Sequence, residues 1–417
     1  MTELPKIISV DDHVVEPPGV WQDRLPARFL EVGPRIVRTA VKEMTFVGGK
    51  FTAVPAEVGA PGPMVDWWFY EDLRRPLIRL DAAVGVPREE VTLTGVTYDE
   101  MRPGAYEVKP RLADMDTNWI EASLCFPTFP RFCGQTFMEA KDRELGLLCV
   151  KAYNDWMIDE WCAESDGRLI PLPLIPLWDA QLAAAEVRRN AERGARAVCF
   201  SEIPPYLGLP SVHDQSGFWD PFFAACAETS TVVCMHIGSS SKMPSTSADA
   251  PPAVGSTLTH SNAGYSLVDF LFSGVLVRFP DLRLAYSEGQ VGWIPYILER
   301  ADVVWEQNRA WGGIADKVPE RPSTYYYRQV YGCFFDDAHG LKNIEAVGED
   351  NITYESDYPH SDSTWPETRQ IAEVQMKDLT DEQVYKVVRG NAIKMLGLNL
   401  DDPNPNRSSP DREIRDK

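Results

Sequence analysis

The chain has 417 residues, of which 44% are hydrophobic, and it carries a formal net charge of −21 with a pI near 4.8. An excess of acid this large argues against nucleic-acid and membrane partners. The first six residues contain no apolar signal core, and no apolar run approaches the roughly 18 residues of a membrane span. The eight cysteines form no C-x-x-C pair. We therefore expect reduced core thiols and a cytoplasmic protein.

Short apolar stretches alternate with helical patterns through most of the sequence, an order typical of a parallel sheet with crossover helices. Eight such stretches predict an α/β fold, a (β/α)8 TIM barrel in which residues 1–398 form one domain. The predicted strands are residues 6–11, 122–126, 169–174, 197–200, 231–236, 282–287, 330–334 and 351–356.

A long insertion, about residues 18–110, follows the first predicted strand and is rich in Pro, Gly, Trp and Phe. Because long departures from barrels usually lie in the loops at the mouth, we expect it to form a lid. Its aromatic run, residues 67–70, is more typical of core packing, although in a lid it could line an apolar pocket. Residues 399–417 are charged and Pro-rich, and are predicted to be a disordered tail.

Carboxylate and imidazole side chains stand where several predicted strands end, which is where barrel enzymes carry their catalytic groups. Asp11 and His13 are two residues apart on an extended segment and therefore project to the same side. These are the ligand types for hard or borderline divalent metals. The six predicted metal ligands are Asp11, His13, Glu202, His236, Glu288 and Asp357.

Simpler explanations exist for each residue taken alone. A lone His after an apolar strand is more often a satisfied buried imidazole, and Asp357 could act only as a turn or N-cap residue. Glu288 could be the first residue of a loop, and Glu202 precedes two prolines. The joint placement of six such residues favours metal binding. His360, just beyond the last strand, could serve in acid–base chemistry or in a loop hydrogen bond.

These motifs resemble the amidohydrolase superfamily, in its aminocarboxymuconate-semialdehyde decarboxylase-like branch, over roughly residues 5–398. The resemblance lies in the D-x-H of Asp11 and His13, in His236 within Cys-Met-His-Ile-Gly, and in Asp357 within Ser-Asp-Tyr-Pro. Asp11 replaces the first His of the usual H-x-H. In the region of the decarboxylases' His-Gly-Gly, Ser287 and Glu288 stand in place of the His.

The replacement of imidazoles by carboxylates favours harder ions such as manganese or iron over zinc. The resemblance implies that Glu202 occupies the position from which dinuclear members supply a bridging carboxylate. The carboxylate-rich subgroup resembles a non-haem di-iron hydroxylase of diterpenoid antibiotic (platensimycin-type) biosynthesis. This resemblance implies two iron ions, with zinc or manganese as the alternatives.

Three functions remain open from the sequence. The first, slightly favoured by the ligand chemistry, is a di-iron monooxygenase that uses O2 to hydroxylate a hydrophobic, terpenoid-like small molecule. The second is a metal-dependent hydrolase or decarboxylase acting on a small carboxylate or amide. The third is an inactive barrel that serves as a binding module, which six ligand-type residues make the weakest of the three. We expect Asp357 and His360 to be catalytic and the protein to be a homo-oligomer.

Overall fold

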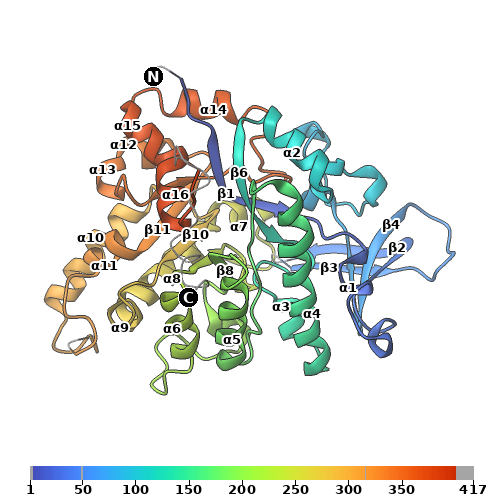
Figure 1. The fold of residues 1–417 in the computed structure, drawn as a ribbon, viewed down its shortest axis with the longest axis horizontal. Helices are drawn as coiled ribbons and strands as arrows, with labels where there is room; N and C mark the ends of the chain where they lie inside the picture. Colours follow the sequence, from blue (N-terminus) through green and yellow to red (C-terminus); the bar gives the residue numbers. More distant parts are fainter. Residues whose placement is uncertain (1–2, 48–49, 315, 401–417) are drawn as a thin grey trace, which may run out of the picture.

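The computed structural model of the chain describes residues 3–47, 50–314 and 316–400. Eight parallel strands form its central sheet, in the spatial order β7-β6-β1-β12-β11-β10-β9-β8 (Figure 1). All eight predicted strands are confirmed, while the predicted tail lies outside the described residues from 401 onward. The strands are β1 (Ile7–Val14), β6 (Ile120–Pro127), β7 (Leu169–Ile170), β8 (Ala197–Phe200), β9 (Val232–His236), β10 (Leu284–Ser287), β11 (Val330–Phe334) and β12 (Ile352–Tyr354).

The seam between β7 and β8 is the weakest part of the sheet. Strand β7 is only two residues long, because Pro171 and Pro173 follow it and prolines have no N–H to donate to a ladder. The extended segment still bonds to its neighbour, since the amide of Cys199 in β8 donates to the carbonyl of Pro173 at 3.0 Å. This bond links the two ends of the sheet, as expected for a TIM-barrel-like fold.

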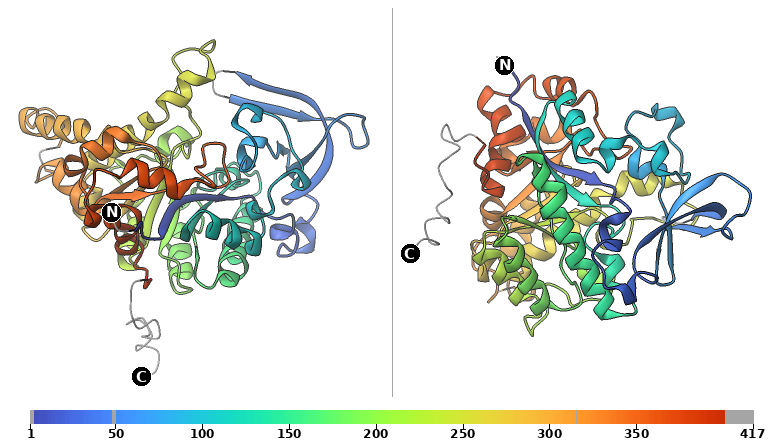
Figure 2. Two further views of the ribbon diagram at one scale, coloured as in Figure 1. Left: turned by 90° about the horizontal axis from the view of Figure 1, so that it is seen from above. Right: turned by 45° about the vertical axis from the view of Figure 1, so that its right-hand side comes forward.

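Helices cover the outside of the strands (Figures 1 and 2). Local signals in the sequence set several of their ends. Asp142 and Asp179 each accept two backbone amides at the start of α4 and α5, and Gly274 ends α8 with a left-handed φ of 77°. The longer helices are α2 (Val108–Thr117), α4 (Arg143–Trp156), α5 (Ala180–Ala191), α6 (Asp220–Glu228), α7 (Pro252–Leu258), α8 (His260–Ser273), α10 (Ile294–Gln307), α11 (Pro322–Gln329), α14 (Thr368–Gln375) and α16 (Asn391–Leu396).

The insertion after β1 contains an antiparallel sheet that the weak sequence periodicity did not predict. Its strands, in the order β3-β2-β4-β5, project from one side of the barrel (Figure 2). They are β2 (Arg35–Val47), β3 (Lys50–Pro55), β4 (Met64–Tyr70) and β5 (Leu73–Pro76). Trp67 and Trp68 are fully buried, and Trp68 stacks on Phe129 of the barrel with ring centroids 4.8 Å apart. The aromatic run is therefore core rather than a ligand cage.

Hydrogen bonds to backbone carbonyls fix the insertion to the barrel mouth. The amide of Ala83 donates to the carbonyl of Pro359, beyond β12, at 2.8 Å. The hydroxyl of Tyr98 donates to the carbonyl of Glu16, beyond β1, at 2.6 Å. The insertion is thus attached to the loops that follow the first and the last strands of the barrel.

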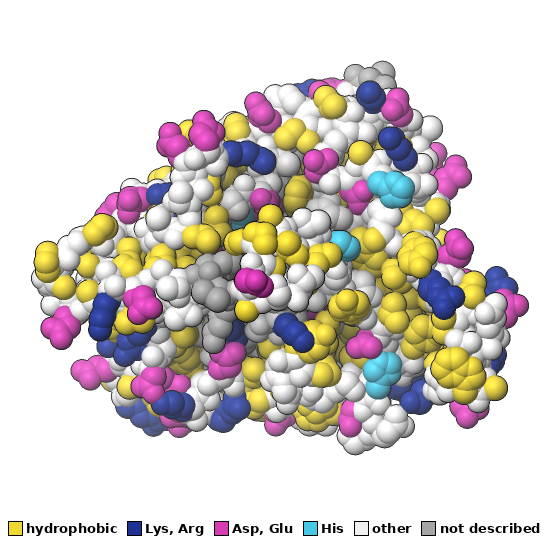
Figure 3. Space-filling model, turned by 180° about the vertical axis from the view of Figure 1, so that it is seen from behind, with side chains coloured by type: hydrophobic (Ala, Val, Ile, Leu, Met, Phe, Trp, Pro, Cys, Tyr) yellow, Lys and Arg dark blue, Asp and Glu magenta, His cyan; other side chains and the backbone are white. Residues whose placement is uncertain are grey.

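The cysteines lie in the core as free thiols, as the sequence analysis expects. All eight cysteines are buried and free. On the face shown in Figure 3, hydrophobic side chains gather across the middle, and many of the charged side chains lie nearer the edges. None of the helices in the described ranges combines the length and hydrophobicity that a membrane span requires.

Asp12 connects β1 to β6 and to the segment that follows β12. Its Oδ1 accepts hydrogen bonds from the hydroxyls of Ser9 at 2.9 Å and Ser356 at 2.7 Å, and from the amide of Tyr358 at 3.1 Å. Its Oδ2 accepts from the hydroxyl of Ser123 in β6. Both oxygens of this buried carboxylate are therefore used to hold β1 against β6 and against the segment after β12.

We predict that Asp12→Ala lowers the free energy of unfolding by about 3 kcal/mol or more, because it leaves several buried donors without an acceptor. Urea denaturation would measure the loss. Asp12→Asn is the matched control and should lose less, because it keeps one carbonyl oxygen. A loss below about 1 kcal/mol in Asp12→Ala would contradict this role.

Candidate metal centre

Backbone pairing brings the two ends of the chain together at the carboxyl edge of the barrel. The amide of His13 donates to the carbonyl of Tyr358 at 2.6 Å, and the amide of Asp357 donates to the carbonyl of Asp11 at 3.0 Å. This short seam therefore joins residues that are more than 340 positions apart in the sequence. As a result, the side chains of Asp11, His13 and Asp357 converge.

His236, at the end of β9, joins this group. Its Nε2 lies 3.5 Å from Oδ2 of Asp11, while Nε2 of His13 lies 3.6 Å from Oδ1 of Asp11 and 3.2 Å from Oδ1 of Asp357. One ligand atom from each of Asp11, His13 and His236 lies within 4.8 Å of the others. All four side chains are buried.

These inward-facing atoms have no hydrogen-bond partners in the described part of the chain. No hydrogen bond satisfies either oxygen of Asp11 or of Asp357, or Nε2 of either imidazole; their close charged contacts are with one another, with Glu288 and with His360. Each such atom would cost about 1–3 kcal/mol if nothing bound to it. Nδ1 of His236 lies 2.5 Å from the carbonyl oxygen of Ile237. A proton on Nδ1 would be donated to this oxygen, which leaves the lone pair of Nε2 available to a metal. The donor set fits a divalent metal.

Two further carboxylates adjoin these four residues. Oε2 of Glu288 lies 3.2 Å from Nε2 of His236, and the amide of Glu288 donates to Oε2 of Glu355 at 3.0 Å. Glu288 and Asp357 both have left-handed backbones, with φ of 58° and 53°. Such strain in residues other than glycine concentrates at functional sites.

Glu355 is a site residue that the sequence analysis did not assign. It is fully buried, accepts a hydrogen bond from the thiol of Cys333, and lies with Asp11 in a second group of possible ligands. Its spacing from Asp357 repeats the spacing of Asp11 and His13, and this repeat could have identified it. The buried ligand cluster is defined here as Asp11, His13, His236, Glu288, Glu355 and Asp357.

Burial controls the charges in this cluster. Burial, followed by repulsion from Glu355 and Asp357, raises the pKa of Asp11 well above its ordinary value. Burial also raises the pKa of Glu355 to about 7 and lowers that of His236 to about 4. Uncompensated charge is therefore costly here, while a neutral imidazole is favoured, as metal ligation requires. A divalent cation would offset the repulsion between the carboxylates.

Glu202 lies outside the groups of ligand atoms found among the described residues. Its Oε1 accepts hydrogen bonds from the amide of Gly238 at 3.0 Å, the hydroxyl of Ser240 at 2.8 Å and the amide side chain of Asn262 at 3.1 Å. Burial raises its pKa to about 7. Its contacts therefore hold the Ser-rich loop after β9, and its bridging role stays a prediction.

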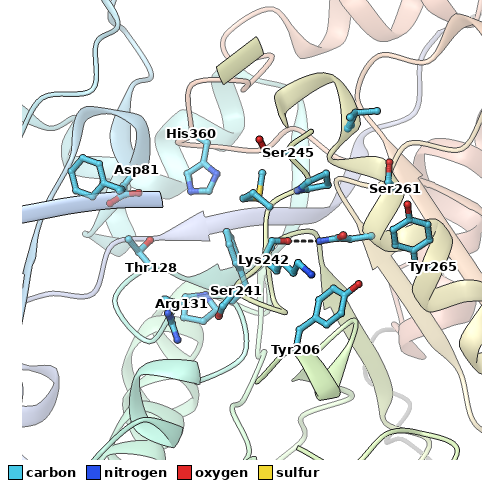
Figure 4. A pocket seen from close by; sticks show the side chains of 18 of the residues that line it. Asp81, Thr128, Arg131, Tyr206, Ser241, Lys242, Ser245, Ser261, Tyr265 and His360 are labelled. Atoms are coloured by element: carbon cyan, nitrogen blue, oxygen red, sulfur yellow. Dashed lines mark hydrogen bonds between the residues drawn. The ribbon is translucent and has the colours of Figure 1, made fainter. Parts of the chain in front are cut away.

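A cavity of about 1150 Å³ lies over the buried ligand cluster. Two of its lining rings cover the cluster: His360 stacks on His13 with centroids 3.5 Å apart, and Phe132 stacks on His236 at 4.1 Å. Figure 4 shows His360 and Asp81 on one side of this mouth cavity, with Ser261 and Tyr265 on the other.

His360 also contacts the cluster directly. Its Nδ1 lies 3.1 Å from Oδ1 of Asp357. Burial alone would lower the pKa of His360, but the Asp357 carboxylate outweighs this effect and raises it. For Asp357, burial would raise the pKa, and the neighbouring His360 and His13 reverse the direction. The two residues therefore favour an ion pair at the floor of the cavity.

Basic side chains are concentrated in the lining of the mouth cavity. Arg75, Arg131 and Lys242 line it, against one acid, Asp81. Arg131 pairs with Glu139 at 2.5 Å, whereas the guanidinium of Arg75 has neither a hydrogen bond nor an ion pair to a described residue and experiences only the nearby charges of Asp81, Arg131 and Glu16. The lining of the mouth cavity is therefore more basic than the protein as a whole, which has a net charge of −21.

The remaining histidines lie away from the cluster. His339 is exposed, and Nε2 of His213 lies 3.1 Å from Oδ1 of Asp269 near the surface. His260 begins α8 and lines a separate hollow.

Comparisons with known proteins agree with this fold. The family profile described as amidohydrolase matches residues 81–398, and a search of curated proteins found no match. An amidohydrolase from Mycobacterium avium subsp. paratuberculosis is 21% identical, with 94% of this chain and 99% of that chain covered and a TM-score of 0.68.

Two decarboxylases are also similar in structure. The 5-carboxyvanillate decarboxylase from Novosphingobium aromaticivorans, solved with manganese and 4-hydroxy-3-methoxy-5-nitrobenzoic acid, is 17% identical (95% and 99% covered, TM-score 0.60). The 2,6-dihydroxybenzoate decarboxylase from Rhizobium is 15% identical (94% and 99% covered, TM-score 0.57). Identities this low establish only the fold, but the family profile matches well over half of the sequence, and the chain belongs to the amidohydrolase family.

Proposed function

We propose that the protein is a metal-dependent decarboxylase acting on a carboxylate substrate. The observation that carries the proposal is the position of the unpartnered ligand atoms of Asp11, His13, His236 and Asp357 directly beneath a cavity with basic lining. Two proteins of similar fold are named as decarboxylases, and one was solved with manganese. The expectation that oxygenation is favoured finds no support in these comparisons.

Asp11, His13, His236 and Asp357 would hold the metal, with Glu288 at the edge of the site. With Glu288 counted, three carboxylates face two imidazoles, and such a set fits manganese or iron better than zinc. When bound, such an ion supplies Lewis-acid stabilisation of negative charge on the substrate.

The residues of the mouth cavity have separate parts in this proposal. Arg75 and Arg131 would bind the acidic group, since guanidinium groups pair with carboxylates through two hydrogen bonds. Loss of CO2 leaves an electron pair on carbon, which must take up a proton. His360 faces the cavity and contacts Asp357, so it is placed to hold that proton.

The insertion would serve as the lid. Phe51, Arg75 and Asp81 all come from it and line the mouth cavity. In Figure 2 the far end of β2 and β3 approaches α7, and Leu258 at the end of α7 lines the same cavity. A cover of this kind would exclude water from the reacting groups.

A di-iron oxygenase is the second candidate, and one observation favours it. Glu355 lies beside Asp11, and Glu288 lies beside His236, so the site holds enough carboxylates for a second metal ion. Such an enzyme would hydroxylate a hydrophobic molecule with O2.

We predict that manganese added to metal-stripped protein raises its melting temperature. A ligand at about 1,000 times its dissociation constant adds roughly 4 kcal/mol to stability, and scanning calorimetry with metal analysis would measure both effects. His236→Ala should lose bound metal and the shift, whereas His213→Ala should keep them. Full metal content in His236→Ala would refute the ligand assignment.

Oxygen dependence separates the two candidate functions. We expect CO2 release from a panel of aromatic carboxylates, including 5-carboxyvanillate and 2,6-dihydroxybenzoate, to proceed at the same rate with and without O2. Decarboxylation needs no oxidant. Oxidised product formed only in air, by protein that binds about two iron ions, would overturn the decarboxylase proposal in favour of the oxygenase.

We predict that His360→Gln lowers the turnover rate by about 10²- to 10⁴-fold, the usual contribution of a positioned proton donor. Metal content should not change if His360 acts on the proton alone; it must be measured, because His360 also lies with His13 and Asp357 in a group of possible ligands. His339→Gln, an exposed change, is the control and should be fully active. Turnover within about twofold of the unmodified protein would remove His360 from the mechanism.

A further inference from the structure

A second hollow, the α8–α10 groove, has a volume of about 520 Å³ and lies between helices α8 and α10. Its lining is mainly apolar. Apart from the tyrosine hydroxyls, its polar or charged side chains are His260, Ser261 and Asp269. The apolar and aromatic residues that line it are Gly264, Tyr265, Val268, Trp293, Tyr296 and Ile297.

The groove adjoins the mouth cavity. Ser261 and Tyr265, in the first turns of α8, line both hollows. In Figure 4 these two side chains stand on the side of the cavity opposite His360. A ligand that reaches the cluster beside His360 can therefore extend across the cavity towards α8 and the groove.

The groove has features of a binding surface for apolar groups. Tyr265 is 60% exposed and Tyr296 is 71% exposed, although both are large aromatic side chains. Gly264 leaves room along α8, since a Cβ at that position would lie 3.7 Å from the Trp293 ring, an ordinary contact distance. Concave apolar surfaces of this kind commonly mark ligand sites.

We infer that the α8–α10 groove binds the apolar extension of the substrate, whose acidic head lies in the mouth cavity. The substrate class is then an amphipathic carboxylic acid, longer than a simple benzoate. Arg75, Arg131 and Lys242 line the cavity, whereas the groove lining contains no Arg or Lys, so the two hollows match the two ends of such a molecule. The assignment of an acidic head group rests on the proposed function, whereas the assignment of the groove does not.

Binding of a chain-length series tests the inference without turnover. Titration calorimetry of the full-length, manganese-loaded protein would use butyrate, hexanoate, octanoate and decanoate. Once the tail reaches the groove, affinity should rise about three- to fourfold for each added methylene, the factor that corresponds to about 0.8 kcal/mol per buried CH2. A series with no rise in affinity would overturn the inference.

Two variants locate the effect. Gly264→Leu fills the groove and Val268→Glu places a charge in it, so both should abolish the chain-length dependence. Gly264→Ala, which fits beside Trp293, and Val374→Glu, at a site on α14 that is 68% exposed, should preserve it. If Gly264→Leu does not fold, Val268→Glu decides. An unchanged dependence in the folded groove variants would refute the assignment.

Other outcomes separate this inference from its alternatives. If sedimentation shows a dimer that Tyr296→Glu dissociates while chain-length dependence is unaffected, the groove belongs to a second copy and the inference is wrong. If decanoate binds as expected but no panel acid is decarboxylated, the groove assignment stands and the proposed function fails. If CO2 release is found but affinity is independent of chain length, the proposed function stands and the groove assignment fails.

Discussion

The short backbone seam between β1 and the segment after β12 determines both the closure of the barrel and the composition of its site. Amide–carbonyl bonds join His13 to Tyr358 and Asp357 to Asp11, while Asp12 adds side-chain bonds to the same strands. Alternation along an extended strand sends Asp11 and His13 inward and Asp12 into the wall. The interaction that joins the first strand to the last one therefore also places two carboxylates and an imidazole in one buried group.

This arrangement has an electrostatic cost that a cation would offset. Asp11 is buried near Glu355, Asp357 and Glu288, and its pKa is raised by burial and then by these neighbours. The positive φ of Glu288 and Asp357 adds backbone strain at the same place. A fold that needed only stability would fill this position with apolar side chains, since buried charge without compensation is destabilising. The retained carboxylates are best explained by a metal that binds among them.

The strand ends were predictable because each follows a short apolar stretch, and a parallel barrel collects the carboxyl ends of its strands on one face. Such reasoning places residues at the mouth, but it does not tell where each side chain points. Glu202 follows its strand as expected, yet three donors from the loop after β9 and from α8 occupy its Oε1. Glu355 was missed because a carboxylate next to a tyrosine gives no local signal of burial, so that its two-residue spacing from Asp357 was the only indication of a role in the site. The sheet of the insertion depends on pairing between segments, as between β2 and β4, which local periodicity does not reveal.

The barrel and the insertion contribute opposite properties to the same cavity. The barrel supplies a floor of carboxylates and imidazoles, and the insertion supplies Arg75 without a partner among the described residues. A negatively charged substrate would be repelled by the floor alone, because the cluster holds more carboxylates than imidazoles. A bound divalent metal would offset part of the negative charge of the floor, and the arginines at the mouth would add to that effect. If the substrate is an acid, as proposed, its binding should therefore depend on metal binding at this site.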